Sequence, residues 1–191
     1  VHSQVRVLGE DMKRLIKWLA ILLLAAVAGI FVWGYAPDTD AAQMESKYSS
    51  ATSRFAELEP GLRMHYRDEG KADGRVLVLI HGSNASLHTW EPWVKILGKD
   101  YRVISLDLPG HGLTGKNPAG VYDNASYVSV VDRLLVKLKI NKAVIGGNSM
   151  GGGVTWLYTL THPEKVDAML LVDASGQPYA KSGNTPLGFR L

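Results

Sequence analysis

The chain has 191 residues, of which 46% are hydrophobic and 20% are charged, proportions that are ordinary for a folded globular protein. The formal net charge is +3, and Lys13, Arg14 and Lys17 place three positive charges together near the N-terminus. No basic stripe is interleaved with aromatic residues, so we do not expect nucleic acid as a partner. The chain has no cysteine, which excludes disulfides, thiolate metal sites and a cysteine nucleophile.

The first predicted element is the apolar segment 18–37, with the sequence WLAILLLAAVAGIFVWGYAP and no charged residue. At about 1.5 Å per residue, a helix of about 20 residues spans about 30 Å, the thickness of the hydrocarbon core of a bilayer. Trp18 at one end and Trp33 and Tyr35 at the other are suited to the membrane interfaces. We therefore predict a signal anchor or transmembrane helix over residues 12–37. The positive cluster is expected on the cytoplasmic side, and the rest of the chain on the periplasmic or extracellular side.

The same segment also fits a cleaved signal peptide, because the small residues 26–28 (Ala-Val-Ala) suit a cleavage site. The apolar run continues past this point as far as Trp33, which favours a retained anchor. Met12 begins a Met-Lys-Arg sequence typical of a natural start, so we expect residues 1–11 to be an upstream or misassigned extension. Residues 38–53 are polar, small and aperiodic, and they predict a linker.

From residue 54 onward, strand patterns alternate with helix patterns. Strands are predicted over residues 54–58, 62–68, 76–80, 102–106, 143–147 and 168–172. Helices are predicted over residues 87–98, 124–138 and 150–161, the second capped by Asn124. Residues 62–67 alternate as in an outer, half-exposed strand, whereas 76–80 and 168–172 have the composition of buried strands. This order predicts an α/β fold with a mainly parallel sheet covered on both faces.

A nucleophile motif lies between the strand 143–147 and the helix 150–161. Gly147-Asn148-Ser149-Met150-Gly151 matches the pattern Gly-x-Ser-x-Gly. A nucleophile on a very sharp strand-to-helix turn needs small residues two positions before and two after it, so that strand and helix can approach each other. The helix start also places backbone N–H groups near the serine. The motif therefore predicts Ser149 as a nucleophile, with Gly147 and Gly151 as the glycines of the elbow.

A second loop is a candidate for holding the oxyanion. His81-Gly82-Ser83-Asn84 directly follows the buried strand 76–80, so a backbone N–H of this loop can face the nucleophile. We favour the Ser83 N–H as this donor, with the Asn84 N–H as the alternative. The second donor is expected to be the N–H of Met150, the residue after the nucleophile.

Four stretches carry a resemblance to a known family: HGSNASLHTW, RVISLDLPGHGLTG, VIGGNSMGG and HPEKVDAMLLVDASG. From about Phe55 to the end, the chain resembles the N-terminal half of the α/β-hydrolase superfamily. It is most similar to the branch of carboxylesterases, meta-cleavage-product C–C hydrolases and cofactor-free haloperoxidases. The resemblance implies Ser149 as nucleophile and the N–H groups of Ser83 and Met150 as oxyanion donors, with no metal or organic cofactor. A serine at the elbow argues against epoxide hydrolases and haloalkane dehalogenases, whose nucleophile is aspartate.

Catalysis in this fold requires an acid and then a histidine later in the chain than the nucleophile. The only later histidine, His162, lies at the far end of the predicted helix 150–161, too far from Ser149 to act as the base. Asp173 ends the last predicted strand and is a candidate acid. We therefore expect residues 54–191 to be the N-terminal part of a hydrolase domain, truncated near the cap, and this chain alone to be inactive.

The remaining polar candidates have weaker patterns. His81 and His111 lie on loops near the expected site but precede the nucleophile in the chain. His65 and His88 have no context that gives them a role. Asp107, in Leu-Asp-Leu-Pro-Gly, is expected to stabilise a turn.

These features predict a membrane-tethered serine hydrolase acting on carboxylic esters or related small-molecule acyl substrates. Two alternatives remain open from the sequence. Asn148 beside the nucleophile is also found in C–C bond hydrolases of the same fold, although esterases share this string. The second alternative is a non-catalytic membrane-anchored binding protein or pseudoenzyme, which would need no complete set of catalytic residues.

Overall fold

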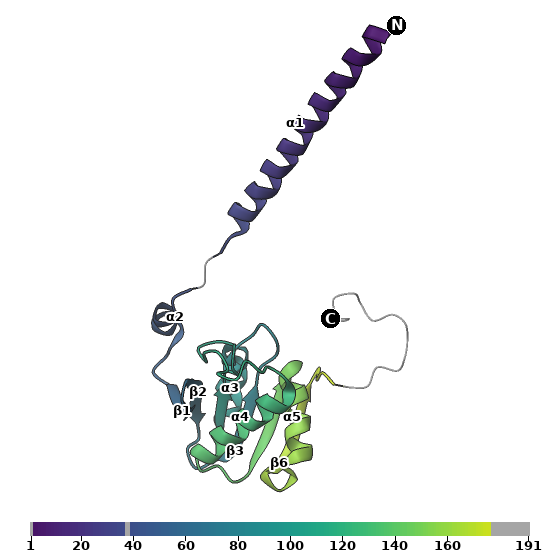
Figure 1. Ribbon diagram of the computed structural model, residues 1–191. Helices are drawn as coiled ribbons and strands as arrows, with labels where there is room; N and C mark the ends of the chain where they lie inside the picture. The colour runs from purple at the N-terminus through teal and green to yellow at the C-terminus, as the bar shows by residue number, and fades with distance from the viewer. Residues whose placement is uncertain (1, 37–38, 177–191) are drawn as a thin grey trace. The chain divides into compact units, whose positions relative to one another are not determined.

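The computed structural model describes residues 2–36 and 39–176, which form two units, Val1–Asp40 and Ala41–Leu191 (Figure 1). The first unit contains the helix α1 (His2–Gly34). Its stretch Met12–Gly34 has 23 residues with a mean hydropathy of 2.5, long and apolar enough to cross a membrane. Length and composition thus agree with the predicted apolar helix.

The second unit contains a six-stranded sheet with the order β1-β2-β4-β3-β5-β6 (Figure 1). Its strands are β1 (Ser53–Glu59), β2 (Leu62–Gly70), β3 (Arg75–Ile80), β4 (Tyr101–Leu106), β5 (Ala143–Asn148) and β6 (Val166–Val172). β2 is antiparallel to both of its neighbours, and the other pairs are parallel. The predicted mainly parallel α/β sheet is confirmed. Because β3, β4, β5 and β6 run in the same direction, the loops that follow them leave from one edge of the sheet.

Helices cover both faces of this sheet. α4 (Asn124–Lys137) and α5 (Met150–Thr161) pack against one core, and the short 3-10 helix η1 (Leu87–Trp90) and α3 (Glu91–Leu97) pack against the other. The remaining helices of this unit are α2 (Ala41–Tyr48) and the 3-10 helix η2 (Pro163–Lys165). Successive residues of a strand point to opposite faces, so β3 contributes to two cores. Ile80 lies in the larger core with residues of α4 and α5. Leu79 lies in the smaller one with Trp90 of η1 and Val103 of β4.

Two helix predictions need correction, and the predicted linker 38–53 contains the short helix α2. Glu45 of this helix forms an ion pair of 2.6 Å with Arg63 on β2. The predicted helix 87–98 is divided into η1 and α3, with a proline in the first turn of α3. The N-cap of α4 is Asp123 and not Asn124, because the Asp123 side chain accepts a hydrogen bond from the Ser126 N–H.

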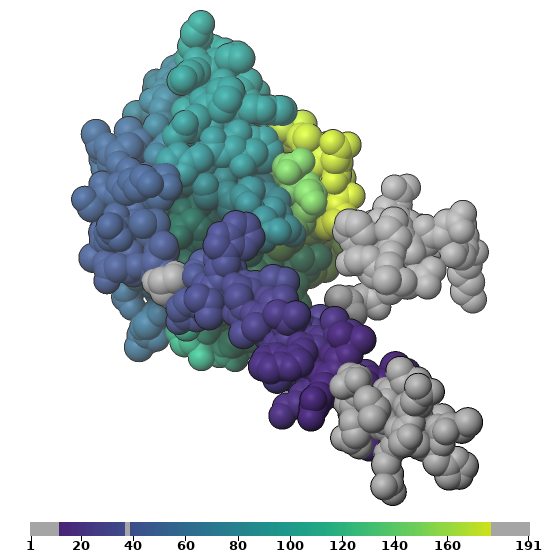
Figure 2. Space-filling view, turned by 90° about the horizontal axis from the view of Figure 1, so that it is seen from above, coloured from purple at the N-terminus to yellow at the C-terminus, as the bar shows by residue number. Residues whose placement is uncertain are grey.

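Two strands differ in exposure from the simple pattern. β6 has the composition of a buried strand and is the edge strand among the described residues, where Met169 and Leu171 are 45% and 42% exposed. Residues near the end of the described chain, coloured yellow in Figure 2, lie at the surface. Conversely β2 lies between β1 and β4, and its polar residues His65 and Arg67 are buried. The alternation along β2 shows that the strand has an apolar and a polar face. It does not show whether other parts of the protein cover the polar face.

Candidate active site

Ser149 occupies the turn between the end of β5 and the start of α5. Its backbone has φ 50° and ψ −116°, outside the regions that non-glycine residues ordinarily adopt. Such strain is maintained only where the surrounding structure fixes it, and it gathers at functional sites. The Ser149 N–H donates to the Val172 carbonyl (3.0 Å), and the Ser149 carbonyl accepts from the Ser175 N–H (2.9 Å). The strained turn is therefore held from the end of β6.

The two glycines of the motif leave no room for a side chain. A Cβ atom on Gly147 would lie 2.1 Å from the Gly151 carbonyl oxygen, and one on Gly151 would lie 2.2 Å from the Ile80 carbonyl oxygen. Both obstacles are backbone atoms, which cannot rotate away. The spacing of the motif thus has a steric cause in this fold, with β5, α5 and the end of β3 in direct backbone contact.

The loop after β3 lies against Ser149. A Cβ atom on Gly82 would lie 3.2 Å from the Ser149 Cβ, and the Ser83 hydroxyl donates to the Met150 sulfur at 3.5 Å. Within the described residues no acceptor is found for the Ser83 N–H. Met150 is the first residue of α5, so its N–H has no helical acceptor. The structure therefore brings both predicted oxyanion donors beside the serine with their N–H groups available. Asn84, the alternative donor, has φ 52° and an exposed side chain.

The predicted acid and the late histidine lie at opposite ends of the domain. Asp173 directly follows β6 with φ 45° and is exposed, one residue beyond the carbonyl that holds the Ser149 N–H. His162 is the C-cap of α5, at the other end of the helix that begins after Ser149. The 12 residues of α5 therefore separate His162 from Ser149, and His162 cannot serve as a base for Ser149.

His81 is near the site but both of its ring nitrogens are occupied. Its Nδ1–H donates to the Gly82 carbonyl (2.7 Å), and its Nε2 accepts from the Leu108 N–H (3.1 Å). Burial lowers the pKa of His81, which keeps the imidazole neutral. His111 is half-buried, donates to the Pro109 carbonyl, and has its ring 5.0 Å from that of His81. Among residues 39–176, no imidazole forms a hydrogen bond with the Ser149 hydroxyl.

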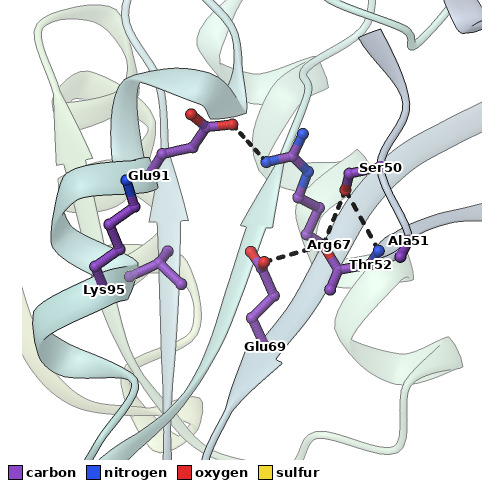
Figure 3. A pocket seen from close by; sticks show the side chains of 8 residues that line it. Ser50, Ala51, Thr52, Arg67, Glu69, Glu91 and Lys95 are labelled. Carbon is purple, nitrogen blue, oxygen red and sulfur yellow. Dashed lines mark hydrogen bonds and ion pairs between the residues drawn. The ribbon is translucent and has the colours of Figure 1, made fainter.

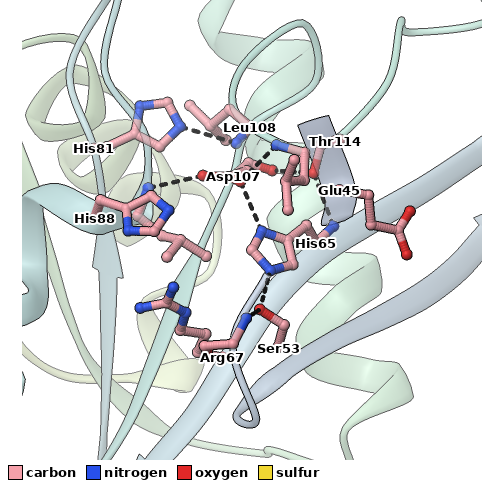
Figure 4. A network of polar contacts seen from close by, with 12 residues as sticks. Glu45, Ser53, His65, Arg67, His81, His88, Asp107, Leu108 and Thr114 are labelled. Carbon is pink, nitrogen blue, oxygen red and sulfur yellow. Dashed lines mark hydrogen bonds and ion pairs between the residues drawn. The ribbon is translucent and has the colours of Figure 1, made fainter. Parts of the chain in front are cut away.

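His65, to which the sequence assigns no role, is the centre of a buried network (Figure 4). Its Nδ1 lies 2.8 Å from the Asp107 carboxylate and its Nε2 lies 2.9 Å from the Ser53 hydroxyl. The side chains of His65 and Asp107 are 0% and 1% exposed. No local pattern identifies this series, because its members are 12 and 42 residues apart along the chain.

Asp107 is bound by more than the imidazole. Its carboxylate also accepts from the Leu87 N–H (2.7 Å) and the Leu113 N–H (2.9 Å), as expected for a residue that stabilises turns. Burial opposes ionisation of this carboxyl, but the hydrogen bonds from His65 and the two amides outweigh it and hold the pKa of Asp107 below its ordinary value. Asp107 is therefore ionised at neutral pH.

The hydrogen bonds that link Ser53, His65 and Asp107 follow the same sequence as in a Ser–His–Asp catalytic triad. The surroundings of Ser53 nevertheless differ from those of Ser149. The Ser53 hydroxyl already accepts a hydrogen bond from the Ser50 N–H (3.0 Å), and His65 is fully buried. Ser53 lies on the regular strand β1, without the strained turn and the two available N–H groups that surround Ser149. The arrangement of the Ser53 series supports a structural role.

A cavity of about 380 Å³ lies elsewhere, between α3, β2 and the segment that precedes β1 (Figure 3). Its lining consists of Ser50, Ala51, Thr52, Arg67, Glu69, Glu91, Val94 and Lys95. Two polar pairs line it: Arg67 donates to Glu91 at 2.7 Å, and Thr52 donates to Glu69 at 2.9 Å. None of the residues predicted to act in catalysis borders this cavity, so the nucleophile elbow is the better candidate site.

A family profile described as "alpha/beta hydrolase fold" matches residues 75–191, which include the nucleophile elbow and the loop after β3. The chain belongs to this α/β-hydrolase family. The match covers more than half of the chain, and the fold and strand order agree with it.

Individual relatives and solved structures match over parts of their length. A serine hydrolase-like protein of Danio rerio is 32% identical over 127 residues, which are 66% of this chain and 39% of that protein. A meta-cleavage product hydrolase from Pseudomonas fluorescens is 34% identical with a TM-score of 0.60, covering 65% of this chain and 46% of that one. A bacterial membrane phospholipase A is 29% identical with a TM-score of 0.65, covering 89% of this chain and 55% of that one. The chain thus spans about two fifths to just over half of these relatives.

Proposed function

We propose that this α/β hydrolase is a serine hydrolase that cleaves carboxylic esters or related small-molecule acyl substrates, with Ser149 as its nucleophile. The observation that carries the proposal is the strained backbone of Ser149, placed beside two available N–H groups. Strain of this kind in an α/β hydrolase exposes the serine hydroxyl above the sheet edge. The backbone contacts of Gly147 and Gly151 support the same assignment.

The proposed reaction is acyl transfer to the serine followed by hydrolysis. The Ser149 hydroxyl attacks the substrate carbonyl and gives up its proton to a histidine base. Negative charge develops on the carbonyl oxygen, and the N–H groups of Ser83 and Met150 are placed to donate hydrogen bonds to it. We expect the base to come from outside the described residues, and Asp173 remains the candidate acid. No step of this scheme requires a metal or an organic cofactor.

Covalent labelling tests the proposal directly. The full-length protein is treated with a fluorophosphonate, and the modified peptide is identified by mass spectrometry. We expect labelling at Ser149, with loss of the label in Ser149→Ala and retention in the matched control Ser53→Ala. Absence of label on folded full-length protein would contradict the proposal and favour a non-catalytic binding protein or pseudoenzyme. Labelling at Ser53 would instead identify Ser53 as the nucleophile, with His65 and Asp107 as its partners.

Hydrolysis of a carbon–carbon bond is the second candidate reaction for the same serine. The similarity to a meta-cleavage product hydrolase favours it. Simple p-nitrophenyl esters and a vinylogous diketone, compared on the same preparation, distinguish the two reactions through the ratio of kcat/KM values. We expect the esters to be the better substrates.

We further propose that α1 anchors this hydrolase to a membrane, with the folded unit on the periplasmic or extracellular side. The supporting features are the uncharged apolar segment and the positive cluster of Lys13, Arg14 and Lys17 that precedes it. A cleaved signal peptide is the competing interpretation of the same segment.

A further inference from the structure

The loop after β3, residues 81–87, is fixed at both ends by the segment that follows β4. At one end, His81 Nε2 accepts from the Leu108 N–H at 3.1 Å. At the other end, the Leu87 N–H donates to Asp107 at 2.7 Å. The proposed oxyanion donor, the Ser83 N–H, lies between these two attachments. The position of that donor therefore depends on how firmly residues 107 and 108 are held.

Asp107 is held in turn by His65. Besides the 2.8 Å bond between His65 Nδ1 and the carboxylate, the Asp107 N–H donates to the His65 carbonyl at 3.0 Å. Thr114 adds a second connection, since its hydroxyl accepts from the His65 N–H and donates to the Asp107 carbonyl, both at 2.8 Å. The loop after β4 also encloses the carboxylate, because a Cβ atom on Gly112 would lie 2.1 Å from Asp107 Oδ2. One buried carboxylate thus joins β2, the loop after β3 and the loop after β4 (Figure 4).

We propose that His65 is a positioning residue for the reaction: through Asp107, it fixes the loop 81–87 that carries the Ser83 N–H. This inference rests on the proposed function of Ser149. Neither His65 nor Asp107 touches the reacting atoms in this arrangement. Oxyanion donors act only when they are aimed at the place where charge develops, and a displacement of about 1 Å can lower the rate about 100-fold. A buried, fully bonded carboxylate is a rigid support for such a donor.

The two ring nitrogens of His65 allow a matched pair of variants. In His65→Asn, the amide nitrogen stands near the position of Nδ1 and can still donate to Asp107, while the contact with Ser53 is lost. In His65→Gln, the longer side chain places its amide near the position of Nε2, so Ser53 keeps a partner. Asp107 then loses the hydrogen bond from residue 65 and keeps those from the Leu87 and Leu113 N–H groups. Both variants are polar and of similar size. Ser53→Ala removes the contact with His65 Nε2, together with the hydrogen bond from the Ser50 N–H, and leaves the bond between His65 and Asp107 in place.

The first readout is kinetic, on full-length protein with a p-nitrophenyl ester. We expect kcat to fall about 10- to 100-fold in His65→Gln with little change in KM, because the donor acts mainly in the transition state. The kcat of His65→Asn and of Ser53→Ala should stay within about 3-fold of the wild-type value, because in both variants the side chain of residue 65 still donates to Asp107. Thermal melting of the same variants separates this pattern from a general loss of stability. Equal losses of kcat in His65→Asn and His65→Gln, or an unchanged kcat in His65→Gln, would overturn the inference.

The second readout does not depend on activity. Amide hydrogen exchange of the peptide covering residues 81–90 should be faster in His65→Gln than in His65→Asn, because the Leu87 N–H then donates to a carboxylate that is less firmly held. Equal exchange in the two variants overturns the inference even if the enzyme is active. Fluorophosphonate labelling of the wild type is read first, since absence of label at Ser149 refutes the proposed function and, with it, any role of His65 in the reaction.

Discussion

Gly146 and Gly147 are neighbours in β5 but have different surroundings. Comparing them shows why the nucleophile motif needs a glycine at position 147. A Cβ atom on Gly147 would meet the Gly151 carbonyl oxygen at 2.1 Å, whereas one on Gly146 would meet the Leu79 Cδ2 atom at 3.1 Å. The first obstacle is backbone and the second is the end of a flexible side chain. We expect Gly147→Ala to lower the free energy of unfolding by about 3 kcal/mol, the upper end of the usual cost of overpacking. Urea denaturation of the folded unit measures it.

Gly146→Ala is the control for this prediction, since it adds the same methyl group one residue earlier in the same strand. We expect its effect to stay within about 1 kcal/mol, because Leu79 can shift by a few tenths of an ångström. If the two variants were equally stable, the close approach of β5 and α5 would not be the reason for the glycine in the motif.

At the scale of residues, the sequence predicts a site well when the interacting residues are close together along the chain, and poorly when they are far apart. The environment of Ser149 is encoded within the five residues Gly147 to Gly151, so the pattern predicts both the turn and the small neighbours. His65 depends on a carboxylate 42 residues away and on a hydroxyl 12 residues away, on three different parts of the chain. No spacing rule links such positions, and only the pairing of β1, β2 and β4 brings them together.

At the scale of elements, the N-cap of α4 lies one residue before the position predicted from the sequence, and this difference can be tested. The Asp123 side chain accepts from the Ser126 N–H at 2.8 Å, which satisfies one of the amides left open at the start of the helix. We expect Asp123→Ala to lower the free energy of unfolding by about 1 kcal/mol. Asn124→Ala, at the position that sequence reasoning selects as the cap, should cost about 0.5 kcal/mol or less, because it lies inside the helix. Chemical denaturation compares the two, and the reverse order would restore Asn124 as the cap.

The order of helices and strands could be predicted because the apolar patterns of the strands and of α4 and α5 are strong. The exposure of each strand to solvent could not be predicted from these patterns. β2 has the alternation of an outer strand and yet lies between β1 and β4, since alternation does not specify the neighbours of a strand. Arg67 on β2 is buried because Glu91, at the start of α3, pairs with it at 2.7 Å. Such a partner, 24 residues away, becomes visible only when the layers are assembled.

At the scale of the whole molecule, the chain combines an apolar helix with an α/β-hydrolase unit, and the role of the helix decides where the proposed enzyme would work. We expect the full-length protein to stay in the membrane fraction after alkaline extraction and to retain residues 12–34. Leu23→Arg places a charge in the middle of the apolar stretch, which costs about 2.5–3.5 kcal/mol on insertion scales. This variant should shift protein into the soluble fraction or prevent export.

Leu15→Arg is the matched control, because the same side chain then stands beside Lys13, Arg14 and Lys17, where it can reach the interface. We expect it to fractionate like the wild type. Mass spectrometry of the mature N-terminus separates the two interpretations of the segment. A protein that begins after Ala28 and is released from membranes would identify a cleaved signal peptide, whereas a retained segment with the Leu23→Arg defect would support an anchor. Protease added outside intact cells should degrade the hydrolase unit, because we expect the positive cluster to keep the N-terminal end of the helix on the cytoplasmic side.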